Sequence, residues 1–213
     1  MNIYITNIGV KEKELIPFLS AERLKKTNNI TNEKVRREKI YAYGLLRYSL
    51  FEERLTTSAP AFSYGQNGKP FLTDYPDIHF NLSHADGFCA CAVSDEEIGL
   101  DIQDYRPLKA DISRKICTPA ELKAVNASDD PQKEICRLWC MKEARGKLTG
   151  KGFAEGFDKI ETAELIKKGE LYSTVAFDGL FVSICGFSPL PEINIIRLTE
   201  EKLFEKLCAM SEL

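Results

Sequence analysis

Apolar residues recur at helical spacing in several stretches of the chain. Residues 31–53 form the clearest stretch, in which Thr31 or Asn32 can cap a helix that carries Val35, Ile40, Tyr43, Leu46 and Leu50. A helix start is predicted at residues 118–121, which supply an N-cap threonine, a proline at N1 and a glutamate at N3. A longer helix is expected over about residues 132–148, closed by Gly150 and Gly152, and a last one over residues 199–210.

Strand patterns lie between these helices. The chain begins with a short β-like run, and residues 58–77 are rich in glycine, proline, asparagine and aspartate, which predicts a loop carrying short strands. Strands are expected around 78–80, 88–93, 98–103, 158–162, 171–177 and 181–187, with a hairpin turn at Asp178-Gly179. Alternation over 98–103 places Asp101 and Gln103 on one face of a strand whose other face is buried.

The order of elements indicates an α+β fold. Each half runs strand, helix, then strands, and the 213 residues permit one large domain or two small ones. The strand pattern ends at residues 104–107, so the expected boundary separates an N-terminal lobe, residues 1–104, from a C-terminal lobe, residues 105–213.

Composition narrows the class of protein. With 44% hydrophobic and 29% charged residues the chain is globular, and a net charge of −3 argues against a nucleic-acid binder. No apolar run approaches the ~20 residues that cross a bilayer, and the first residues lack a signal-peptide pattern, so a cytoplasmic protein without membrane contact is expected. Seven irregularly spaced cysteines with two histidines and no CxxC pair favour buried thiols over a zinc site.

Charge is uneven along the chain. Residues 11–54 hold eleven Lys or Arg against seven Asp or Glu, a local charge of +4 that leaves −7 elsewhere. Arg36, Arg37 and Arg47 are expected to project from the polar side or the ends of the helix over 31–53. They form either an ordinary solvated face or an anion site.

Three groups of residues could carry chemistry. Asp101, Gln103 and Glu143 supply oxygen ligands of the kind that Mg²⁺ prefers, although a capped turn or a surface charge also explains Asp101. Glu143 and Lys147 share a helix face, where a surface ion pair is the simpler interpretation. Ser83-His84 can form a turn that donates hydrogen bonds to a phosphate, or the histidine can be structural.

These groups occur in a recognisable order. The chain carries Gly68-Lys69-Pro70, then Phe80-Asn81-Leu82-Ser83-His84, Ile98-Gly99-Leu100-Asp101-Ile102, Trp139-Cys140-Met141-Lys142-Glu143-Ala144 with Lys147, and Gly150-Lys151-Gly152. Together they resemble the 4′-phosphopantetheinyl transferase superfamily in its Sfp-type branch. The resemblance implies two similar α/β lobes with the active site in the cleft between them, and a monomer.

The resemblance also implies a reaction. Such enzymes bind coenzyme A and Mg²⁺ and transfer 4′-phosphopantetheine to a serine of an acyl or peptidyl carrier protein, releasing adenosine 3′,5′-bisphosphate. It implies that Asp101, Gln103 and Glu143 surround the metal, that Glu143 and Lys147 are catalytic, and that Trp139 and Lys142 are scaffold. Coenzyme A would contact Lys69, Ser83, His84 and the three arginines Arg36, Arg37 and Arg47.

Gln103 departs from the pattern of many Sfp-type members, which carry an acidic residue at this position. The amide removes one negative charge, so activity with an altered metal dependence is expected. Two alternatives stay open: another Mg²⁺-dependent enzyme acting on a nucleotide or a coenzyme A derivative, and a non-catalytic module of the same fold that binds coenzyme A or a carrier protein. The sequence does not distinguish fatty-acid, polyketide and peptide carriers.

Overall fold

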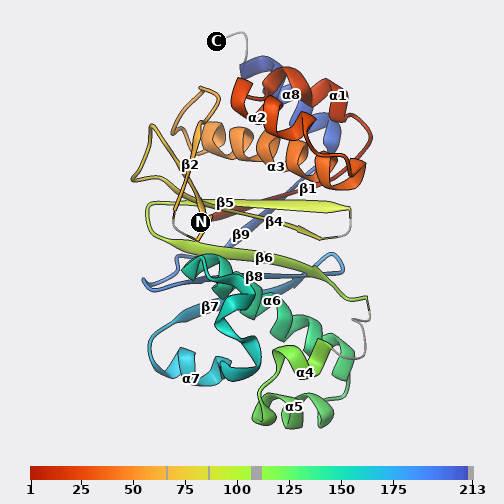
Figure 1. Cartoon of the computed structure of the whole chain (residues 1–213), viewed down its shortest axis with the longest axis vertical. Coiled ribbons are helices and arrows are strands. Elements are labelled where there is room, and N and C mark those ends of the chain that lie inside the picture. The colour runs from red at the N-terminus through yellow and green to blue at the C-terminus, as the bar shows by residue number, and fades with distance from the viewer. Residues whose placement is uncertain (66, 86, 107–111, 211–213) are drawn as a thin grey trace. The chain divides into compact units, whose positions relative to one another are not determined.

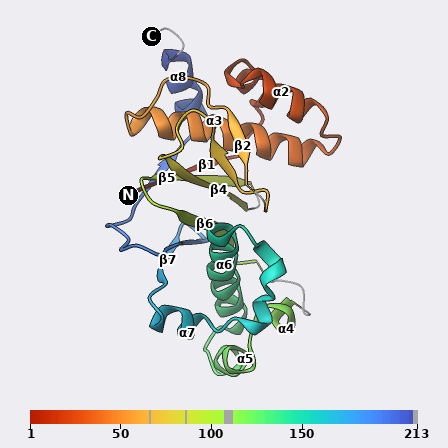
Figure 2. The same ribbon diagram turned by 60° about the vertical axis from the view of Figure 1, so that its left-hand side comes forward.

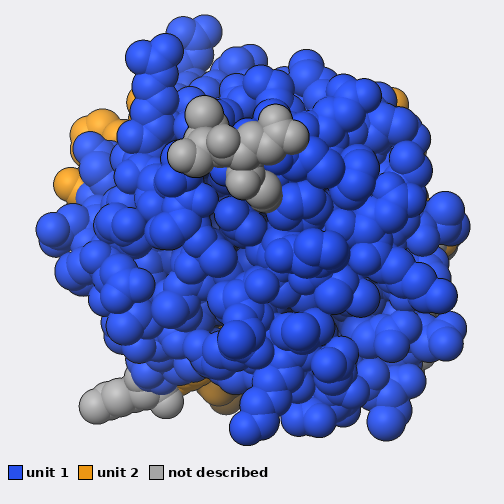
Figure 3. Space-filling model, turned by 90° about the horizontal axis from the view of Figure 1, so that it is seen from above, with its two compact units in different colours: residues 1–66, 70–95, 192–213 blue, residues 67–69, 96–191 orange. Residues whose placement is uncertain are grey.

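A computed structural model describes residues 1–65, 67–85, 87–106 and 112–210 of the chain. It contains both helices and several sheets (Figure 1). Two compact units are present: unit 1 comprises residues 1–66, 70–95 and 192–213, and unit 2 comprises residues 67–69 and 96–191 (blue and orange in Figure 3). The prediction of a fold that mixes helices and sheets is therefore confirmed.

Unit 1 contains a four-stranded sheet in the order β4-β5-β1-β9. Its strands are β1 (Asn2–Asn7), β4 (His79–Ala85), β5 (Phe88–Ser94) and β9 (Asn194–Leu198). β5 pairs antiparallel with both β4 and β1, whereas β9 pairs parallel with β1. A separate two-stranded hairpin consists of β2 (Phe62–Tyr64) and β3 (Pro70–Leu72).

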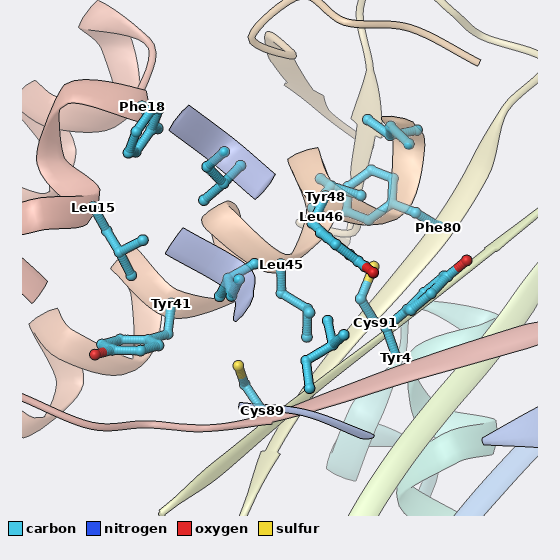
Figure 4. Close-up of a cluster of buried hydrophobic side chains, with 14 of the residues drawn as sticks. Tyr4, Leu15, Phe18, Tyr41, Leu45, Leu46, Tyr48, Phe80, Cys89 and Cys91 are labelled. Atoms are coloured by element: carbon cyan, nitrogen blue, oxygen red, sulfur yellow. The ribbon is translucent and has the colours of Figure 1, made fainter. Parts of the chain in front are cut away.

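The long helix α3 (Glu33–Glu52) packs on this sheet (Figures 1 and 2). Its side chains meet β1, β4 and β5 in a core that includes Tyr41, Leu45, Leu46, Tyr48, Tyr4, Phe80, Cys89 and Cys91 (Figure 4). Shorter elements of unit 1 are α1 (Glu12–Leu15), η1 (Ile16–Phe18), α2 (Ala21–Asn28) and α8 (Glu200–Met210).

Unit 2 contains a three-stranded antiparallel sheet in the order β6-β8-β7. Its strands are β6 (Ile98–Asp104), β7 (Leu171–Phe177) and β8 (Leu180–Gly186). The helix α6 (Pro131–Thr149) packs against β6 and β8 (Figure 1). The remaining elements are α4 (Ile112–Ile116), α5 (Pro119–Asn126), η2 (Gly152–Glu155), η3 (Phe157–Lys159) and α7 (Thr162–Lys167).

Most of the predicted elements are confirmed. Asn32 caps α3, Thr118 and Glu121 form the capping box of α5, and Gly150 ends α6 in the left-handed conformation at φ 72°. The hairpin turn at Asp178-Gly179 has φ values of 51° and 79°, as a two-residue turn of type I′ requires.

Two local predictions are wrong, and one strand was not predicted. Residues 158–162 are not a strand, because the 3-10 helix at 157–159 and the start of α7 at Thr162 leave only two extended residues between them. Ser83-His84 is not a turn, because both residues lie within β4. The sequence analysis also did not identify β9, whose five residues are too short for their pattern to stand out from loop.

The two units divide the chain differently from the expected boundary at residues 104 and 105. β6 belongs to unit 2 because it pairs with β8. Residues 192–213 belong to unit 1 because β9 pairs with β1 and α8 packs against α3. Part of the expected boundary segment, Pro107, lies outside the described residues.

Two composition-based expectations can also be compared with the structure. All seven cysteines are free thiols, and six of them are buried, as expected. No helix in the described part of the chain has the length and apolarity that a membrane span requires.

Candidate active site

The candidate active site of unit 2 depends on a close approach of α6 to β6. Gly99 lies on β6, and a Cβ atom added to it would stand 1.9 Å from the carbonyl oxygen of Ala144 and 2.7 Å from the amide nitrogen of Leu148. Only glycine lets the backbone of α6 come this near. Asp101 follows two residues later on the same strand, so its side chain lies beside the same helix.

Asp101, Glu143 and Lys147 come together at this contact. Lys147 Nζ donates a hydrogen bond of 2.7 Å to Asp101 Oδ1, and the side chain of Asp101 is only 7% exposed. Glu143 precedes Lys147 by four residues, one helical turn, and therefore shares its face of α6. The sequence could place Glu143 and Lys147 together but not bring Asp101 to them.

Electrostatics links the two carboxylates. Burial, together with the nearby charge of Asp101, raises the pKa of Glu143 to about 7, although the charge of Lys147 opposes the shift. Asp101 and Glu143 are thus close enough to repel each other, and a cation beside them would favour both ionised forms. A carboxylate that titrates near neutral pH can also accept a proton from a reacting hydroxyl.

Lys142 has a structural role. Its side chain is 2% exposed, and Nζ donates to the carbonyl oxygens of Ile116 (2.5 Å), Phe157 (2.8 Å) and Ile160 (2.8 Å). It also forms a buried ion pair with Glu121, whose other carboxylate oxygen accepts from the amide and hydroxyl of Thr162. Lys142 therefore ties α6 to three neighbouring segments and fixes the helix that carries Glu143.

Gln103 lies further along β6 and is half-buried. Its amide nitrogen is 3.4 Å from the carbonyl oxygen of the neighbouring Asp104. Within the described residues no group of three or more His, Cys, Asp and Glu side chains is arranged as a metal site. The oxygen atoms that could hold a divalent cation are those of Asp101 and Glu143, with the Gln103 amide as a candidate third.

Lys69 lies at the C-terminal end of α6. Its Nζ donates a 2.9 Å hydrogen bond to the carbonyl oxygen of Leu148 and is 3.9 Å from Glu97. A cation there complements the negative end of the helix dipole. Burial lowers the pKa of Lys69, and Glu97 opposes this shift. Lys69 was expected to contact coenzyme A. In this structure its amine already binds the end of α6, the helix that carries Glu143.

Ser83 and His84 lie in unit 1 on β4, which is the edge strand of its sheet. Adjacent strand residues face opposite sides, so their side chains do not share a face. Ser83 is buried at 2% exposure, whereas 44% of the His84 side chain is exposed. His84 Nε2 lies 3.3 Å from Glu38 Oε2, a carboxylate of α3.

The three arginines of α3 have different surroundings. Arg36 and Arg37 both pair with Glu12, at 3.0 and 2.5 Å. Arg47 is buried and donates to the carbonyl oxygens of Phe18 at 2.8 Å and Thr57 at 3.2 Å. The expectation that Arg47 projects from the polar side or an end of the helix is therefore wrong, because its guanidinium joins η1 and the loop at Thr57 to α3.

Unit 1 also contains a basic, aromatic pocket that was not predicted and that has no room for a water molecule. Arg23 and Lys26 of α2 line it, and Lys26 Nζ donates a 3.1 Å hydrogen bond to Tyr64 Oη. The Arg23 guanidinium lies 5.6 Å from the centroid of the Phe62 ring, and burial lowers its pKa. The other lining residues are Ser20, Glu22, Tyr43 and Pro60. The pattern of polar residues over 21–28 did not indicate a ligand-binding site.

Comparisons with known proteins identify the family of this chain. Residues 97–181, which contain Gly99, Asp101, Glu143 and Lys147, match the sequence profile of the 4′-phosphopantetheinyl transferase superfamily. The chain is 27% identical over 211 residues to the 4′-phosphopantetheinyl transferase psf-1 of Bacillus pumilus, covering 92% of this chain and 90% of that protein.

Two further relatives match over shorter regions. The 4′-phosphopantetheinyl transferase Sfp of Bacillus subtilis is 29% identical over 153 residues, covering 70% of this chain and 68% of that protein. The 4′-phosphopantetheinyl transferase HetI of Nostoc sp. is 31% identical over 160 residues, covering 71% of this chain and 67% of that protein. With these relatives, the matched profile and the motifs assembled around β6 and α6, the chain belongs to the 4′-phosphopantetheinyl transferase superfamily.

Proposed function

We propose that the protein transfers the 4′-phosphopantetheine group of coenzyme A to a serine of an acyl or peptidyl carrier protein and releases adenosine 3′,5′-bisphosphate. The observation that carries the proposal is the meeting of Asp101, Glu143 and Lys147 where α6 crosses β6. The transferase names of the relatives support the same reaction.

The residues at this contact suit the steps of the transfer. The serine oxygen forms a bond to the phosphorus that carries pantetheine, and the bond from that phosphorus to the bridging oxygen of the coenzyme A diphosphate breaks, so that this oxygen leaves with adenosine 3′,5′-bisphosphate. Glu143, whose pKa burial raises to about 7, accepts the serine proton. Lys147 stabilises the negative charge that develops on the phosphoryl and leaving oxygens.

The donor set fits Mg²⁺. Asp101 and Glu143 are carboxylates that repel each other when both are ionised, and Lys147 offsets this repulsion in part. These two residues would hold the ion, with the Gln103 amide as a third donor or as a partner of a metal-bound water. When bound, Mg²⁺ would neutralise the diphosphate and polarise the reacting phosphorus.

Coenzyme A contacts are proposed for Lys69, Ser83 and His84. In unit 1 Arg23 and Lys26 lie beside the aromatic rings of Phe62 and Tyr64, and Lys26 also pairs with Glu22 at 2.6 Å. The pocket that they line has no room for a water molecule, so these two cations are proposed only as partners of an anionic group of coenzyme A at its surface. Arg36 and Arg37 already neutralise Glu12 and are weaker candidates, and Arg47 is occupied by carbonyl groups.

The proposal includes two similar lobes that bind coenzyme A in a cleft between them, in a monomer. Support comes from their topology. In unit 1 β1, α3, β4 and β5 follow in order, and β5 pairs with β1; in unit 2 β6, α6, β7 and β8 follow in order, and β8 pairs with β6. Free, buried cysteines support a cytoplasmic location.

The direct test is intact-mass spectrometry of an apo carrier protein incubated with this protein, coenzyme A and Mg²⁺. The expected result is a mass gain of one phosphopantetheine that is lost with EDTA and with Glu143→Gln. A matched control is Glu134→Gln, which changes a carboxylate of α6 that pairs with Arg137 away from the site.

The alternative is a non-catalytic module of the same fold that binds coenzyme A or a carrier. The cluster of Asp101, Glu143 and Lys147 argues against it. Binding alone does not need a carboxylate with a pKa of about 7 beside a second carboxylate. No mass gain on fatty-acid, polyketide and peptide carriers, together with measurable coenzyme A binding, would favour the module.

A further inference from the structure

An exposed aromatic ring lies beside α6, the helix of unit 2 that carries Glu143. Phe153 of η2 is 55% exposed, although it is a large apolar side chain. Its ring centroid lies 5.1 Å from that of Trp139 and 4.8 Å from that of Phe157. Phe157 is 1% exposed and Trp139 is half-buried. Phe153 is therefore the exposed member of a cluster of three rings that is rooted in the core of unit 2.

This ring cluster lies close to Glu143 along α6. Trp139 precedes Glu143 by four residues, which places the two side chains on one face of the helix, about 6 Å apart along its axis. Gly146 follows Glu143 by three residues and contacts the segment that carries Phe153, because a Cβ atom added to Gly146 would stand 2.9 Å from Cα of Gly152. The close approach at Gly146 therefore holds Phe153 next to the turn of α6 that carries Glu143.

The exposed ring is held firmly in place. Besides the two ring contacts, backbone hydrogen bonds close η2 on both sides of Phe153: Ala154 donates to Lys151 at 3.1 Å, and Gly156 donates to Phe153 at 3.0 Å. A side chain that is already fixed loses little conformational entropy when a partner covers it. Exposed aromatic residues of this kind are common anchors in protein interfaces, where they contribute a large apolar area.

The acceptor protein is the partner that has to approach this surface. If Glu143 accepts the serine proton, the serine oxygen comes within hydrogen-bonding distance of Glu143, and the protein around that serine covers the neighbouring part of α6. A stable interface buries about 800 Å² on each partner, an area that extends well beyond one helical turn. Lys147 lies one turn after Glu143 and Trp139 one turn before it, so the ring cluster lies on the side of Glu143 away from Lys147.

We propose that Phe153, supported by Trp139 and Phe157, is a specificity-determining residue that docks an apolar side chain of the carrier protein close to its acceptor serine. This inference rests on the proposed function for the identity of the acceptor. Phe153 takes no part in the bond changes, so it controls the concentration of carrier that transfer requires. It leaves the affinity for coenzyme A unaffected, because a folded partner covers an open ring more completely than a flexible pantetheine chain does.

The first experiment separates the acceptor from the donor by steady-state kinetics and calorimetry. Phe153→Ala is expected to raise the KM for the carrier protein by ~5–20-fold and to leave the Kd of coenzyme A within ~2-fold. Phe153→Tyr keeps the ring and should retain the KM of the unmodified protein. The matched control is Phe187→Ala, which removes a ring that is 57% exposed in the same unit and outside the cluster, and which should leave the KM unchanged.

Two results of this experiment would overturn the proposal. An unchanged carrier KM in Phe153→Ala would show that the ring has only a structural role. Weaker coenzyme A binding with an unchanged carrier KM would assign the ring to the pantetheine arm of the donor.

The second experiment uses the fluorescence of Trp139, the single tryptophan of the chain. A tryptophan-free carrier whose acceptor serine is replaced by alanine is added with coenzyme A and Mg²⁺, so that docking occurs without transfer. The emission should shift to shorter wavelength and saturate, because the carrier excludes water from the ring cluster. This titration tests the proposal on the unmodified protein even if Phe153→Ala does not fold. Transfer to that carrier's serine form without any shift of the emission would overturn the proposal.

The two experiments separate this inference from the proposed function. If carriers are modified but neither the carrier KM of Phe153→Ala nor the Trp139 emission responds, only the docking role is wrong. If no carrier is modified, yet a carrier saturates the shift and Phe153→Ala weakens its binding by ~5–20-fold, the docking surface is supported and the transfer reaction is wrong. If no carrier is modified or bound, both are wrong.

Discussion

Gly99 and Ala144 lie in direct backbone contact, since a Cβ at position 99 would stand 1.9 Å from the Ala144 carbonyl oxygen. Ala144 immediately follows Glu143, and Gly99 precedes Asp101 by two residues. The contact therefore sets the distance between the two carboxylates. A glycine with no chemistry of its own determines whether the site can form.

Gly99→Ala is expected to impair stability and transfer together. The methyl group would force α6 away from β6, and overpacking of this kind costs about 1–3 kcal/mol. Urea denaturation measures the loss, and carrier modification in the folded fraction reports the site. Gly186→Ala is the control, because its nearest contact would be an ordinary 3.4 Å. Equal effects of the two substitutions would contradict the role of Gly99.

Much of the fold was predictable because local signals agree with the final structure. The caps at Asn32 and Thr118, the left-handed Gly150 and the Asp178-Gly179 turn are short-range features that the sequence states directly. β9 was not predictable, since a short strand is stabilised by its parallel partner β1, almost two hundred residues earlier in the chain.

The candidate site was predictable only in part for the same reason. Glu143 and Lys147 follow from helical spacing, but their meeting with Asp101 depends on tertiary packing over Gly99. Arg47 carries the charge expected of an anion ligand, yet its neighbours are backbone carbonyl groups. The motif order of the family supplied the assembly that spacing alone could not.

Replacement by methionine should mainly reduce protein stability at Lys142 and mainly reduce the transfer rate at Lys147. Lys142→Met leaves the buried Glu121 charge uncompensated and should destabilise the protein by ~3–5 kcal/mol. Lys147→Met leaves Asp101 without this partner, but Lys147 itself is 28% exposed, so the substitution should cost less stability than Lys142→Met while reducing the transfer rate by ~100-fold or more. Urea denaturation and single-turnover transfer measure the two effects. Similar losses of stability would contradict this division of roles.

Gln103→Glu should lower the Mg²⁺ concentration needed for half-maximal transfer by at least ~3-fold, because an added carboxylate increases the affinity for a divalent cation. The measurement is the transfer rate over a Mg²⁺ titration at saturating coenzyme A. Asp104→Asn, a charge change at the adjacent residue of β6, serves as the comparison. An unchanged titration in Gln103→Glu would show that position 103 lies outside the metal shell.

Lys26→Ala should weaken coenzyme A binding by ~3–10-fold, because it removes a cation from the pocket beside Tyr64. Lys25→Ala is the matched control, since Lys25 lies on the same helix but does not line the pocket. Calorimetry at two salt concentrations should show a smaller salt dependence for Lys26→Ala alone. Equal effects of both substitutions would indicate general electrostatic attraction without a pocket.

Glu143 should destabilise the metal-free protein above neutral pH. Its pKa is raised by burial and by Asp101 from an ordinary 4.5 to about 7, so the folded state favours the protonated acid. Stability from this group is present below pH ~4.5 and is lost as the pH rises through about 7. Glu143→Gln should therefore stabilise the protein at pH 8.5 in EDTA by roughly 1–2 kcal/mol, allowing for partial exposure, and have little effect at pH 4.5. Urea denaturation of both proteins at the two pH values measures the difference, with Glu205→Gln as a surface control. A stabilisation that does not depend on pH would contradict this role of the Glu143 charge.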